Sequence, residues 1–564
     1  MTMPRVWRFP DPIPESELRQ VGAFPPLQAQ LLHRRGLRSP LETARFLDPR
    51  TLEDRHGVSL LGMAAAVARL LKARERGERV VVFGDYDADG VTATAILEES
   101  MTGWGWNVGH YIPNRFDEGY GLNLPAMKEL ADSGVAVVIT VDCGIRSVEE
   151  VAWAQDHGLD IIVTDHHQPG PQLPRAMAVI NPRQPGESYP FVDFAGAGVA
   201  YKLAQSVAAA LGAPEPEGVL DLVALGTIAD LASLTGENRS LVARGLERMN
   251  RTPRIGLAAL VAAIGVKGGP LTAASVGYVL GPRLNAAGRL ESAKLALDLL
   301  LEANPKLAEG KARKLDDLNR ERQRLTRETT DRAREIVLAE PDLPPILIAA
   351  APEFPEGVVG LAASRLVEEF HRPAIVATPA DGVVRGSARS IVEFPITPAL
   401  DQCREFLLRY GGHTVAAGFS LSQDQWPAFC EAMLRLARAA FAGGMPSAEI
   451  RIDAETAPDD LREDLLQFLD RLEPCGSGNP RPLLALRGAE VLRVRRVGSD
   501  QRHLKLTLRG GQRIWDAIAF RQPAEVGDGM RLDVAFYLER NDYLGVPSLQ
   551  LNVQDLREAS AAAR

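Results

Sequence analysis

The sequence contains only four cysteines, Cys143, Cys403, Cys430 and Cys475, and no two of them form a C-x-x-C motif. This scarcity excludes a disulfide framework and predicts reduced thiols in a cytoplasmic protein. No apolar run reaches the length that spans a membrane, and the N-terminal residues lack the apolar core of a signal peptide. Histidine is also scarce, with nine residues, but two of them are adjacent at positions 166 and 167.

The composition is that of an ordinary globular protein, with 46% hydrophobic and 24% charged residues. At 564 residues the chain is too long for one core, so we expect three or four domains. The formal net charge of −9 by itself argues against a protein that binds nucleic acid. The net charge weighs little for an enzyme with an acidic metal centre, because basic patches can exist within an acidic whole.

Three short apolar runs in the first half of the chain end in acids or histidines. The residues that follow them are Asp85, Asp87 and Asp89 in the first, Asp142 in the second, and Asp165, His166 and His167 in the third. Such runs are typical of strands buried on both faces of a parallel sheet, whose carboxyl ends meet in one crevice. Crowded carboxylates repel one another unless a cation lies among them. We therefore expect a metal site here; the alternative for the first cluster is a solvated Asp-Gly turn.

The side chains of this cluster favour Mn²⁺ or Mg²⁺, because carboxylates with one imidazole suit these ions better than Zn²⁺. Two ions that share a bridging acid could clamp the oxygens of a phosphoester, and Asp142, at the central strand end, is the natural bridge. Beyond the strand end His166 and His167 can both face the crevice, one as a ligand and its neighbour as a hydrogen-bond partner of a substrate phosphate. The alternative is one core histidine and one surface histidine.

Three motifs further along the chain carry residues that suit a phosphate, and we expect all three to be loops. The residues are Arg283, Asn285 and Arg289 in the first motif, Ser387 and Arg389 in the second, and Gly411, Gly412 and His413 in the third. Arginine side chains, exposed backbone N–H groups and an imidazole match an anion. Each motif alone could be an ordinary turn, but three that face a metal lobe favour a phosphorylated substrate.

The order of the patterns divides the chain into successive regions. Strands alternate with helices from about residue 60 to 230, which indicates a parallel sheet with helices on both faces. Residues 300–340 predict a long charged helix between two lobes, and β-rich runs beyond 447, among them 484–486 and 490–495, suggest a small barrel. We expect a cover segment at 1–50 with a helical stretch near 27–47, a catalytic domain at 51–300, a connecting helix at 301–340, a substrate-binding domain at 341–446 and an OB-like nucleic-acid-binding barrel at 447–564.

Several of these motifs, in this order, resemble those of the DHH phosphoesterase superfamily. The segments G-D-Y-D-A-D-G, V-D-C-G-I, T-D-H-H and G-T-I-A-D are similar to its successive DHH motifs, and G-G-H-T-V-A-A-G-F is similar to the signature of its DHHA1 domain. The segments G-P-R-L-N-A-A-G-R-L, R-G-S-A-R-S and P-C-G-S-G-N-P-R-P narrow the resemblance to the single-strand-specific exonucleases of this superfamily. The resemblance implies an α/β fold: a parallel-sheet DHH domain and a smaller DHHA1 α/β domain joined by a long helix, plus a C-terminal OB-like β-barrel.

The resemblance also assigns roles to individual residues. It places the metal ligands at Asp87, Asp89, Asp142, His166 and Asp230, to which we add Asp85. His167 matches the residue that polarises the substrate, and we expect it to act in catalysis together with Asp142. Arg115 joins the residues expected to contact the substrate, which are otherwise those of the three phosphate motifs.

The implied activity is hydrolysis of single-stranded DNA from its 5′ end to 5′-mononucleotides with two Mn²⁺ or Mg²⁺ ions, in DNA repair and recombination. The implied partners are single-stranded DNA, a single-strand-binding protein and a RecQ-type helicase, with no membrane and a monomeric state. One alternative is a phosphodiesterase of the same superfamily that cleaves short oligonucleotides or cyclic dinucleotides. The other is a non-catalytic replication scaffold that binds single strands.

Overall fold

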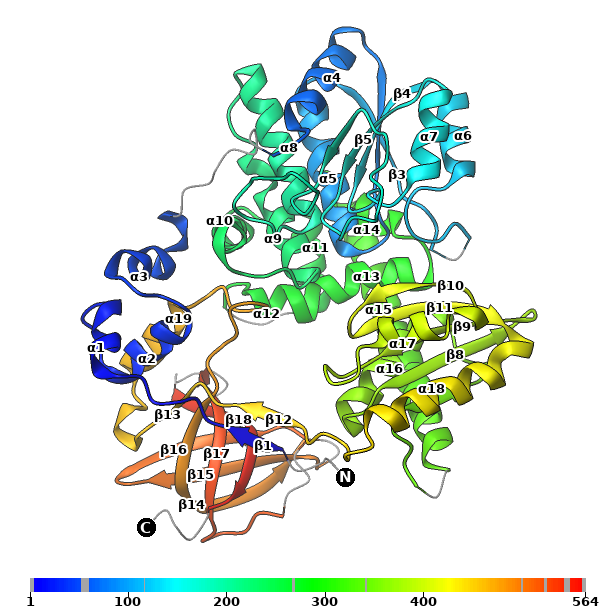
Figure 1. Cartoon of the computed structure of the whole chain (residues 1–564). Coiled ribbons are helices and arrows are strands. Elements are labelled where there is room, and N and C mark those ends of the chain that lie inside the picture. Colours follow the sequence, from blue (N-terminus) through cyan, green and yellow to red (C-terminus); the bar gives the residue numbers. More distant parts are fainter. Residues whose placement is uncertain are drawn as a thin grey trace.

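The computed structural model describes residues 5–51, 60–115, 117–265, 269–339, 342–498, 501–521, 525–541 and 548–559. Three bodies built on separate sheets are arranged around the long helix α15 and the N-terminal helices (Figure 1). We refer to them as the parallel-sheet lobe, the mixed-sheet lobe and the barrel. Among the described residues, no helix is both long and apolar enough to cross a bilayer.

The parallel-sheet lobe is built on five strands in the order β3-β2-β4-β5-β6, all parallel. The strands are β2 (Arg79–Phe83), β3 (Asn107–Tyr111), β4 (Val135–Val141), β5 (Asp160–Thr164) and β6 (Ala178–Ile180). Side chains such as Val82 and Ile139 face one core, whereas Val81 and Val138 face the other. The central strands β2, β4 and β5 are therefore buried on both faces, as expected from their apolar runs.

Helices cover both faces of this sheet. The helices α4 (Met63–Glu75), α5 (Ala88–Gly103) and α8 (Gly196–Leu211) pack on one face, and α6 (Leu124–Asp132) and α7 (Val148–Asp156) pack on the other. Further helices extend the first core: α9 (Leu220–Ala229), α10 (Gly236–Arg251), α11 (Ile255–Ile264), α12 (Ala273–Ser275), α13 (Gly281–Leu290) and α14 (Lys294–Leu300). The expected parallel sheet with helices on both faces is confirmed.

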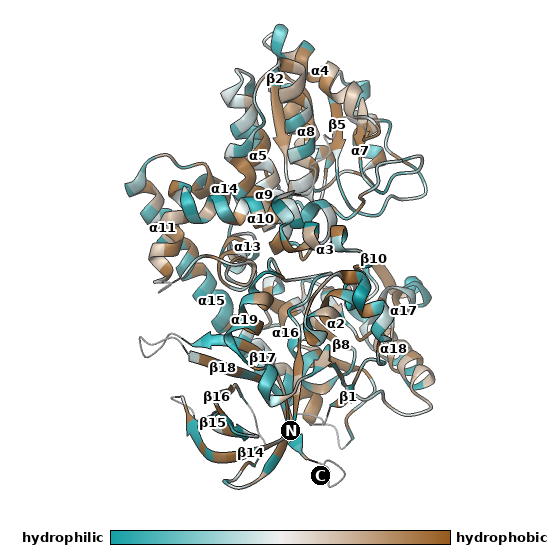
Figure 2. Cartoon of the chain, turned by 90° about the vertical axis from the view of Figure 1, so that its left-hand side faces the viewer, coloured by the Kyte–Doolittle hydropathy of each residue, from teal (hydrophilic) through white to brown (hydrophobic). Residues whose placement is uncertain are grey.

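The long helix α15 (Pro305–Leu338) joins two lobes. Asn304 caps its N-terminus, with its side chain accepting from the N–H groups of Lys306 and Leu307. Near its start Leu315 belongs to the core of the parallel-sheet lobe, and near its end Ala333 belongs to a core of the mixed-sheet lobe. The helix is largely hydrophilic in Figure 2, whereas β2 and β5 are hydrophobic. The expectation of a charged connecting helix is confirmed.

The mixed-sheet lobe has five strands in the order β10-β11-β9-β8-β7, antiparallel except for the pair β7 and β8. They are β7 (Leu347–Ala350), β8 (Ala374–Ala380), β9 (Val383–Arg389), β10 (Leu407–His413) and β11 (Ala416–Ser422). The helices α16 (Glu356–Phe370), α17 (Ile396–Gln402) and α18 (Trp426–Ala440) pack against them.

The expectation of loops at the three phosphate motifs is wrong. Residues 281–289 lie in α13, the second motif lies mainly in β9, and residues 411–413 end β10. Glycine suggested turns, but here it permits close packing between strands. A Cβ on Gly386 would lie 2.3 Å from the ring of Phe419, so the aromatic side chain packs on bare backbone.

The barrel has five strands, closed by the pairing of β14 with β17. They are β14 (Leu484–Val497), β15 (His503–Gly510), β16 (Arg513–Ala519), β17 (Arg531–Asn541) and β18 (Ser548–Glu558). The runs 484–486 and 490–495, expected as separate strands, form one strand, because a bulge at Gly488 (φ 60°) interrupts the apolar alternation without ending the strand. The OB-like barrel is confirmed.

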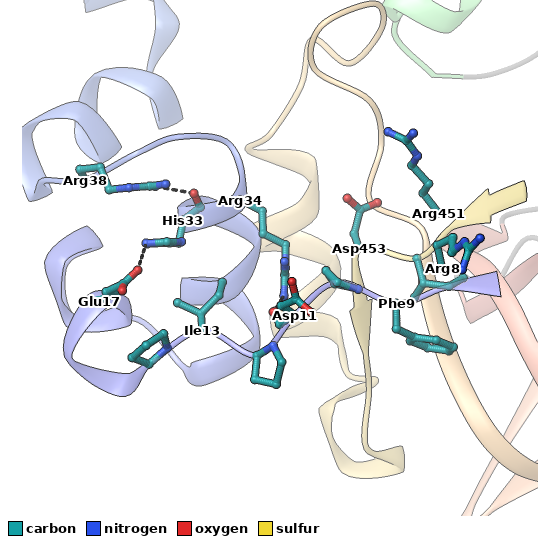
Figure 3. Close-up of a pocket in the computed structure, with 14 residues that line it drawn as sticks. Arg8, Phe9, Asp11, Ile13, Glu17, His33, Arg34, Arg38, Arg451 and Asp453 are labelled. Atoms are coloured by element: carbon teal, nitrogen blue, oxygen red, sulfur yellow. Dashed lines mark hydrogen bonds and ion pairs between the residues drawn. The ribbon is translucent and has the colours of Figure 1, made fainter. Parts of the chain in front are cut away.

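The N-terminal segment packs on the barrel. Its strand β1 (Val6–Arg8) pairs with β12 (Glu449–Arg451), and α2 (Pro26–Arg34), α3 (Pro40–Leu47) and α19 (Glu463–Asp470) share the barrel core. The single helical stretch expected near 27–47 is two helices, because Gly36 (φ 82°) ends the first and the Ser39 side chain caps the second. A pocket of about 670 Å³ lies between this segment and residues 451–453 at the end of β12. Figure 3 shows its lining, in which His33 Nε2 lies 3.2 Å from Glu17 Oε2.

Candidate active site

The acids and histidines expected at the metal site come together at the carboxyl edge of the parallel sheet. Three sets of side chains have ligand atoms within 4.8 Å of one another: Asp85, Asp87 and Asp142; Asp89, His166 and Asp230; and Asp142, His166 and His167. The strand order explains the grouping, because β4 lies between β2 and β5 and its terminal acid reaches both neighbours. Asp230 is the C-cap residue of α9, outside the sheet.

The backbone around two of the acids fixes their direction. Asp142 has a left-handed conformation (φ 61°), which ends β4 abruptly. The first N–H groups of α8, those of Gly196 and Ala197, donate to the two carboxylate oxygens of Asp89 at 2.6 and 2.9 Å. A Cβ on Gly196 would lie 2.7 Å from the Cβ of Asp142, so only glycine allows α8 to begin this close to both acids.

The electrostatics of the cluster are those of a cation site. Burial, reinforced by neighbouring carboxylates, raises the pKa of Asp85 and Asp142 well above the usual range, and that of Asp89 to about 7 and Asp230 to about 8. Among the described residues, Asp85 Oδ1 is buried without a hydrogen-bond partner, and Asp142 Oδ1 and His166 Nε2, also buried, lie 3.0 Å apart but form no hydrogen bond. These unsatisfied acceptors, in a set of carboxylates with imidazole, fit hard divalent cations.

The two adjacent histidines have different surroundings. His166 Nε2 lies 3.0 Å from Asp142 Oδ1, and burial together with the charge of His167 lowers its pKa to about 4, so it is neutral at pH 7. Burial alone would lower the pKa of His167, but the hydrogen bond and charge of Asp165 outweigh it and raise the pKa to about 8. The neutral imidazole of His166 can therefore bind a metal cation, whereas the imidazole of His167 is itself positively charged.

Sequence reasoning placed Asp165 at the crevice without giving it a role, and it did not identify Tyr120. Asp165 accepts hydrogen bonds from the N–H groups of Ile145, His166 and His167, and from the ring of His167. Tyr120 donates from its hydroxyl to the Asp142 carbonyl at 3.0 Å and lies 3.2 Å from His167 Nδ1. The T-D-H-H motif contained a signal for Asp165, whereas nothing in the sequence marked Tyr120.

A group of arginines lies beside the acids. It contains Arg289 of α13, Arg389 of β9, Arg115 of the loop after β3 and Arg322 of α15. Burial and the charges of the other three lower the pKa of Arg289 to about 10. Among the described residues, none of the four forms an ion pair with an acid, so the group has a net positive charge. We call Arg115, Arg289, Arg322 and Arg389 the arginine group.

The other expected substrate contacts take different places. Ser387 Oγ and Arg389 Nη2 both border Gly360 of α16. Asn285 accepts from the N–H of Ala88 at 2.8 Å and so holds the loop that carries the first acids. Arg283 is paired with Asp316 at 2.9 Å, which ties α13 to α15. Gly411, Gly412 and His413 form the end of β10, which lies beside His167.

Arg322 was missed by sequence reasoning. It lies among many charged residues of α15, and nothing local separates it from the solvent-exposed ones. Burial lowers its pKa, and its Nε is buried without a hydrogen-bond partner. Only the packing of α15 against the two lobes distinguishes it.

Comparisons with known proteins agree with this geometry. Family models match three parts of the chain: "DHH family, N-terminal domain" over residues 79–227, "DHHA1 domain" over 344–439 and "RecJ OB domain" over 452–555. The chain is 37% identical over 537 residues to the single-stranded-DNA-specific exonuclease RecJ of Bacillus subtilis, covering 94% of this chain and 68% of the relative. It is 34% identical over 560 residues to RecJ of Escherichia coli, covering 94% and 96%.

Solved structures are similar over nearly the whole chain. RecJ from Thermus thermophilus in complex with Mn²⁺ has a TM-score of 0.86 and 33% identity, covering 98% of this chain and 80% of that one. The same protein in complex with Mg²⁺ has a TM-score of 0.80 and 32% identity, covering 98% and 79%.

Proposed function

The chain belongs to the RecJ family of single-stranded-DNA-specific exonucleases, and on that premise we propose that it degrades single-stranded DNA from the 5′ end to 5′-mononucleotides in DNA repair and recombination. The observation that carries the proposal is the set of six ligand side chains, which three strand ends and the C-terminal end of α9 bring together beside the arginine group. Two divalent ions, Mn²⁺ or Mg²⁺ as in the Thermus relative, would be held by Asp85, Asp87, Asp89, Asp142, His166 and Asp230.

Bound divalent ions supply a nucleophilic water at neutral pH and withdraw negative charge from the phosphodiester. The chain's own residues prepare the site. Asp142 belongs to two of the ligand sets, so it fixes their relative position. His167, held protonated by Asp165, can donate a hydrogen bond to a phosphate oxygen of the substrate.

The arginine group suits the terminal phosphate of a strand, whereas the 5′ direction of the proposal comes from the resemblance to the family. A terminal phosphate carries more negative charge than an internal phosphodiester, so partly buried arginines that form no ion pair among the described residues favour a phosphorylated end. Ser387 and the β10 residues Gly411, Gly412 and His413 would complete this binding site from the mixed-sheet lobe. The strand would then run from the arginine group past the metal site and on toward the barrel.

The proposal extends to partners and setting. A nuclease that degrades single strands depends on a helicase to produce them, and we expect a RecQ-type enzyme in this role. Because single strands in the cell are coated by a single-strand-binding protein, that protein is the second expected partner. We propose that it acts as a monomer in the cytoplasm. The barrel disfavours a phosphodiesterase for short oligonucleotides, which has no need of a further strand-binding module. The intact carboxylates at positions 87, 89, 142 and 230 disfavour a non-catalytic scaffold, because such a protein gains nothing from their repulsion.

One assay tests the proposal. Single-stranded and blunt duplex DNA labelled at the 5′ or the 3′ end is incubated with Mn²⁺, with Mg²⁺ or with a chelator. We expect immediate release of labelled mononucleotide from the 5′-labelled single strand, and from no other substrate, with either ion. Mononucleotide released first from the 3′ label would overturn the direction, and activity in chelator would overturn the metal dependence.

A further inference from the structure

Arg239 of α10 is a buried arginine with no acidic partner among the described residues. It is 1% exposed. Its five hydrogen bonds all go to backbone carbonyls: two to Phe46 (3.2 and 3.1 Å), and one each to Leu472 (3.0 Å), Glu473 (2.9 Å) and Pro474 (3.0 Å). Its guanidinium also lies 4.0 Å from the ring centroid of Phe46. A single side chain thus joins the parallel-sheet lobe to the N-terminal segment and to the chain that enters the barrel.

The chain that enters the barrel, residues 472–480, is held in one shape; we call it the barrel linker. Asn479, 1% exposed, donates to the carbonyls of Leu472 and Pro474 at 2.9 Å each and accepts from Arg35 Nε at 3.0 Å. The same two carbonyls accept hydrogen bonds from Arg239, so both side chains stabilise the same conformation of the linker backbone. The P-C-G-S-G-N-P-R-P motif, which has no role in the catalytic site, supplies most of the residues of this linker.

The barrel linker also contacts the backbone that follows a metal-ligand candidate. The N–H of Leu234 donates to the Ser477 carbonyl at 2.7 Å. A Cβ on Gly478 (φ 71°) would lie 2.1 Å from Ser233 Oγ, so this approach requires glycine. Ser233 is three residues beyond Asp230. The linker is thus packed on the segment that begins at the metal site.

The preceding residue of α10, Asn238, connects the same segment to the histidine side of the site. Asn238, fully buried, donates to the carbonyls of Asp193 (2.6 Å) and Ser233 (3.0 Å). The residue after Asp193 is Phe194, and its backbone forms a hydrogen bond with the imidazole of His166. Of these two adjacent residues of α10, Asn238 therefore binds the backbone near His166 and Asp230, and Arg239 binds the barrel linker.

We propose that Arg239 is a positioning residue that fixes the barrel relative to the metal site, so that one DNA strand can occupy both at once. The inference rests on the proposed function, because it assumes that the strand runs from the metal site to the barrel. Two binding modules joined rigidly in the correct geometry bind a common ligand more tightly than the same modules joined loosely. The arginine therefore acts on long strands and leaves the chemistry at the metal site unchanged.

The test compares substrate lengths in the full chain. Wild type and Arg239→Met are assayed with Mn²⁺ on 5′-phosphorylated oligothymidylates from about 4 to about 40 nucleotides, a range that brackets the site size of an OB fold. We expect equal kcat/KM on the shortest strands and a loss of about tenfold on the longest, carried by KM, as avidity predicts. Hydrogen exchange of residues 472–480 should become faster. An equal loss at every length, or no loss on long strands, overturns the proposal.

A control and a second variant separate this role from general destabilisation. Arg254 is a partly buried arginine whose ion pairs to Glu99 and Asp221 lie within the parallel-sheet lobe. Arg254→Lys should lower Tm without a length-dependent loss. Gly478→Ala disturbs the linker from its other side and keeps Arg239, so it should reproduce the length-dependent loss even if Arg239→Met fails to fold. A Gly478→Ala protein with wild-type behaviour at all lengths would count against the proposal.

Binding distinguishes failure of this inference from failure of the proposed function. Fluorescence anisotropy with the same oligothymidylates in chelator needs no hydrolysis. If wild type hydrolyses none of them, the proposed function is wrong, whereas the anisotropy series still tests Arg239. Tenfold weaker binding of Arg239→Met to long strands alone is the expected result, and identical length dependence in the two proteins overturns it.

Discussion

The imidazole of His413 lies parallel to that of His167, with ring centroids 6.3 Å apart and 14° between the ring planes. The two histidines come from different lobes, one at the end of β10 and the other beyond the end of β5. Burial and the charge of His167 lower the pKa of His413, so a neutral ring faces a protonated one. The mixed-sheet lobe therefore reaches the metal site directly, and substrate contacts from both lobes can be tested separately.

Asp142→Ala should abolish hydrolysis while single-strand binding survives. Asp142 belongs to two of the ligand sets, so both cations should lose affinity together, whereas the arginine group and the barrel are untouched. Loss of several kcal/mol of transition-state stabilisation corresponds to a rate loss of about 1,000-fold or more. Turnover, metal content and anisotropy are measured, with the exposed Asp156→Ala as the matched control. A variant that keeps more than about a tenth of the wild-type rate would contradict the bridging role.

The histidine pair should divide into a ligand and a substrate contact. His166→Ala should lower both metal content and turnover, because its Nε2 lies 3.0 Å from Asp142 Oδ1 and 3.9 Å from Asp89 Oδ2, two carboxylates of the candidate ligand sets. His167→Ala should lower turnover about 100-fold, a usual loss for one charge-stabilising donor, and leave the metal content intact. Metal analysis of the two purified proteins decides the matter. Equal metal loss in both would show that the roles are shared.

A 5′-phosphorylated strand should be degraded faster than a 5′-hydroxyl strand. Arg389 has no acidic partner among the described residues and borders the same glycine as Ser387, so it is free to bind a phosphate. A charge-assisted hydrogen bond of this kind corresponds to a preference of about tenfold or more. Arg389→Ala should erase the preference. Arg385→Ala, on the same strand but paired with Glu356 at 3.0 Å, is the control and should keep it. If the wild-type protein degrades both strands at the same rate, the arginine group does not recognise the terminal phosphate.

Metal binding should release protons near pH 7. Burial and neighbouring acids raise the pKa of Asp89 to about 7 and of Asp230 to about 8, so the metal-free site retains protons that the ligands must lose. The apparent affinity for Mn²⁺ should therefore rise from pH 6 to pH 9. Calorimetry at pH 7 in two buffers of different ionisation enthalpy measures the release. Identical heats in both buffers would contradict the prediction.

The sequence by itself determined the class of fold and predicted which acids and histidines lie together. Apolar runs that end in acids identify buried strands, and the topology of parallel sheets places their ends together, so Asp85, Asp142 and His166 could be joined without a structure. Asp230 was found only through the resemblance, because it ends a helix outside the sheet. The long helix and the barrel follow from composition and spacing, which are also local properties of the chain.

Only the tertiary structure decided how the parts are joined. The second phosphate motif lies on β9, where Gly386 accommodates the ring of Phe419, a contact between distant residues. The N-terminal segment, expected as a separate cover, shares the core of the barrel at the other end of the chain. Arg322 and Arg239 look like other charged helical residues in the sequence. Their roles come from burial against segments far along the chain, and a local pattern carries no information about such contacts.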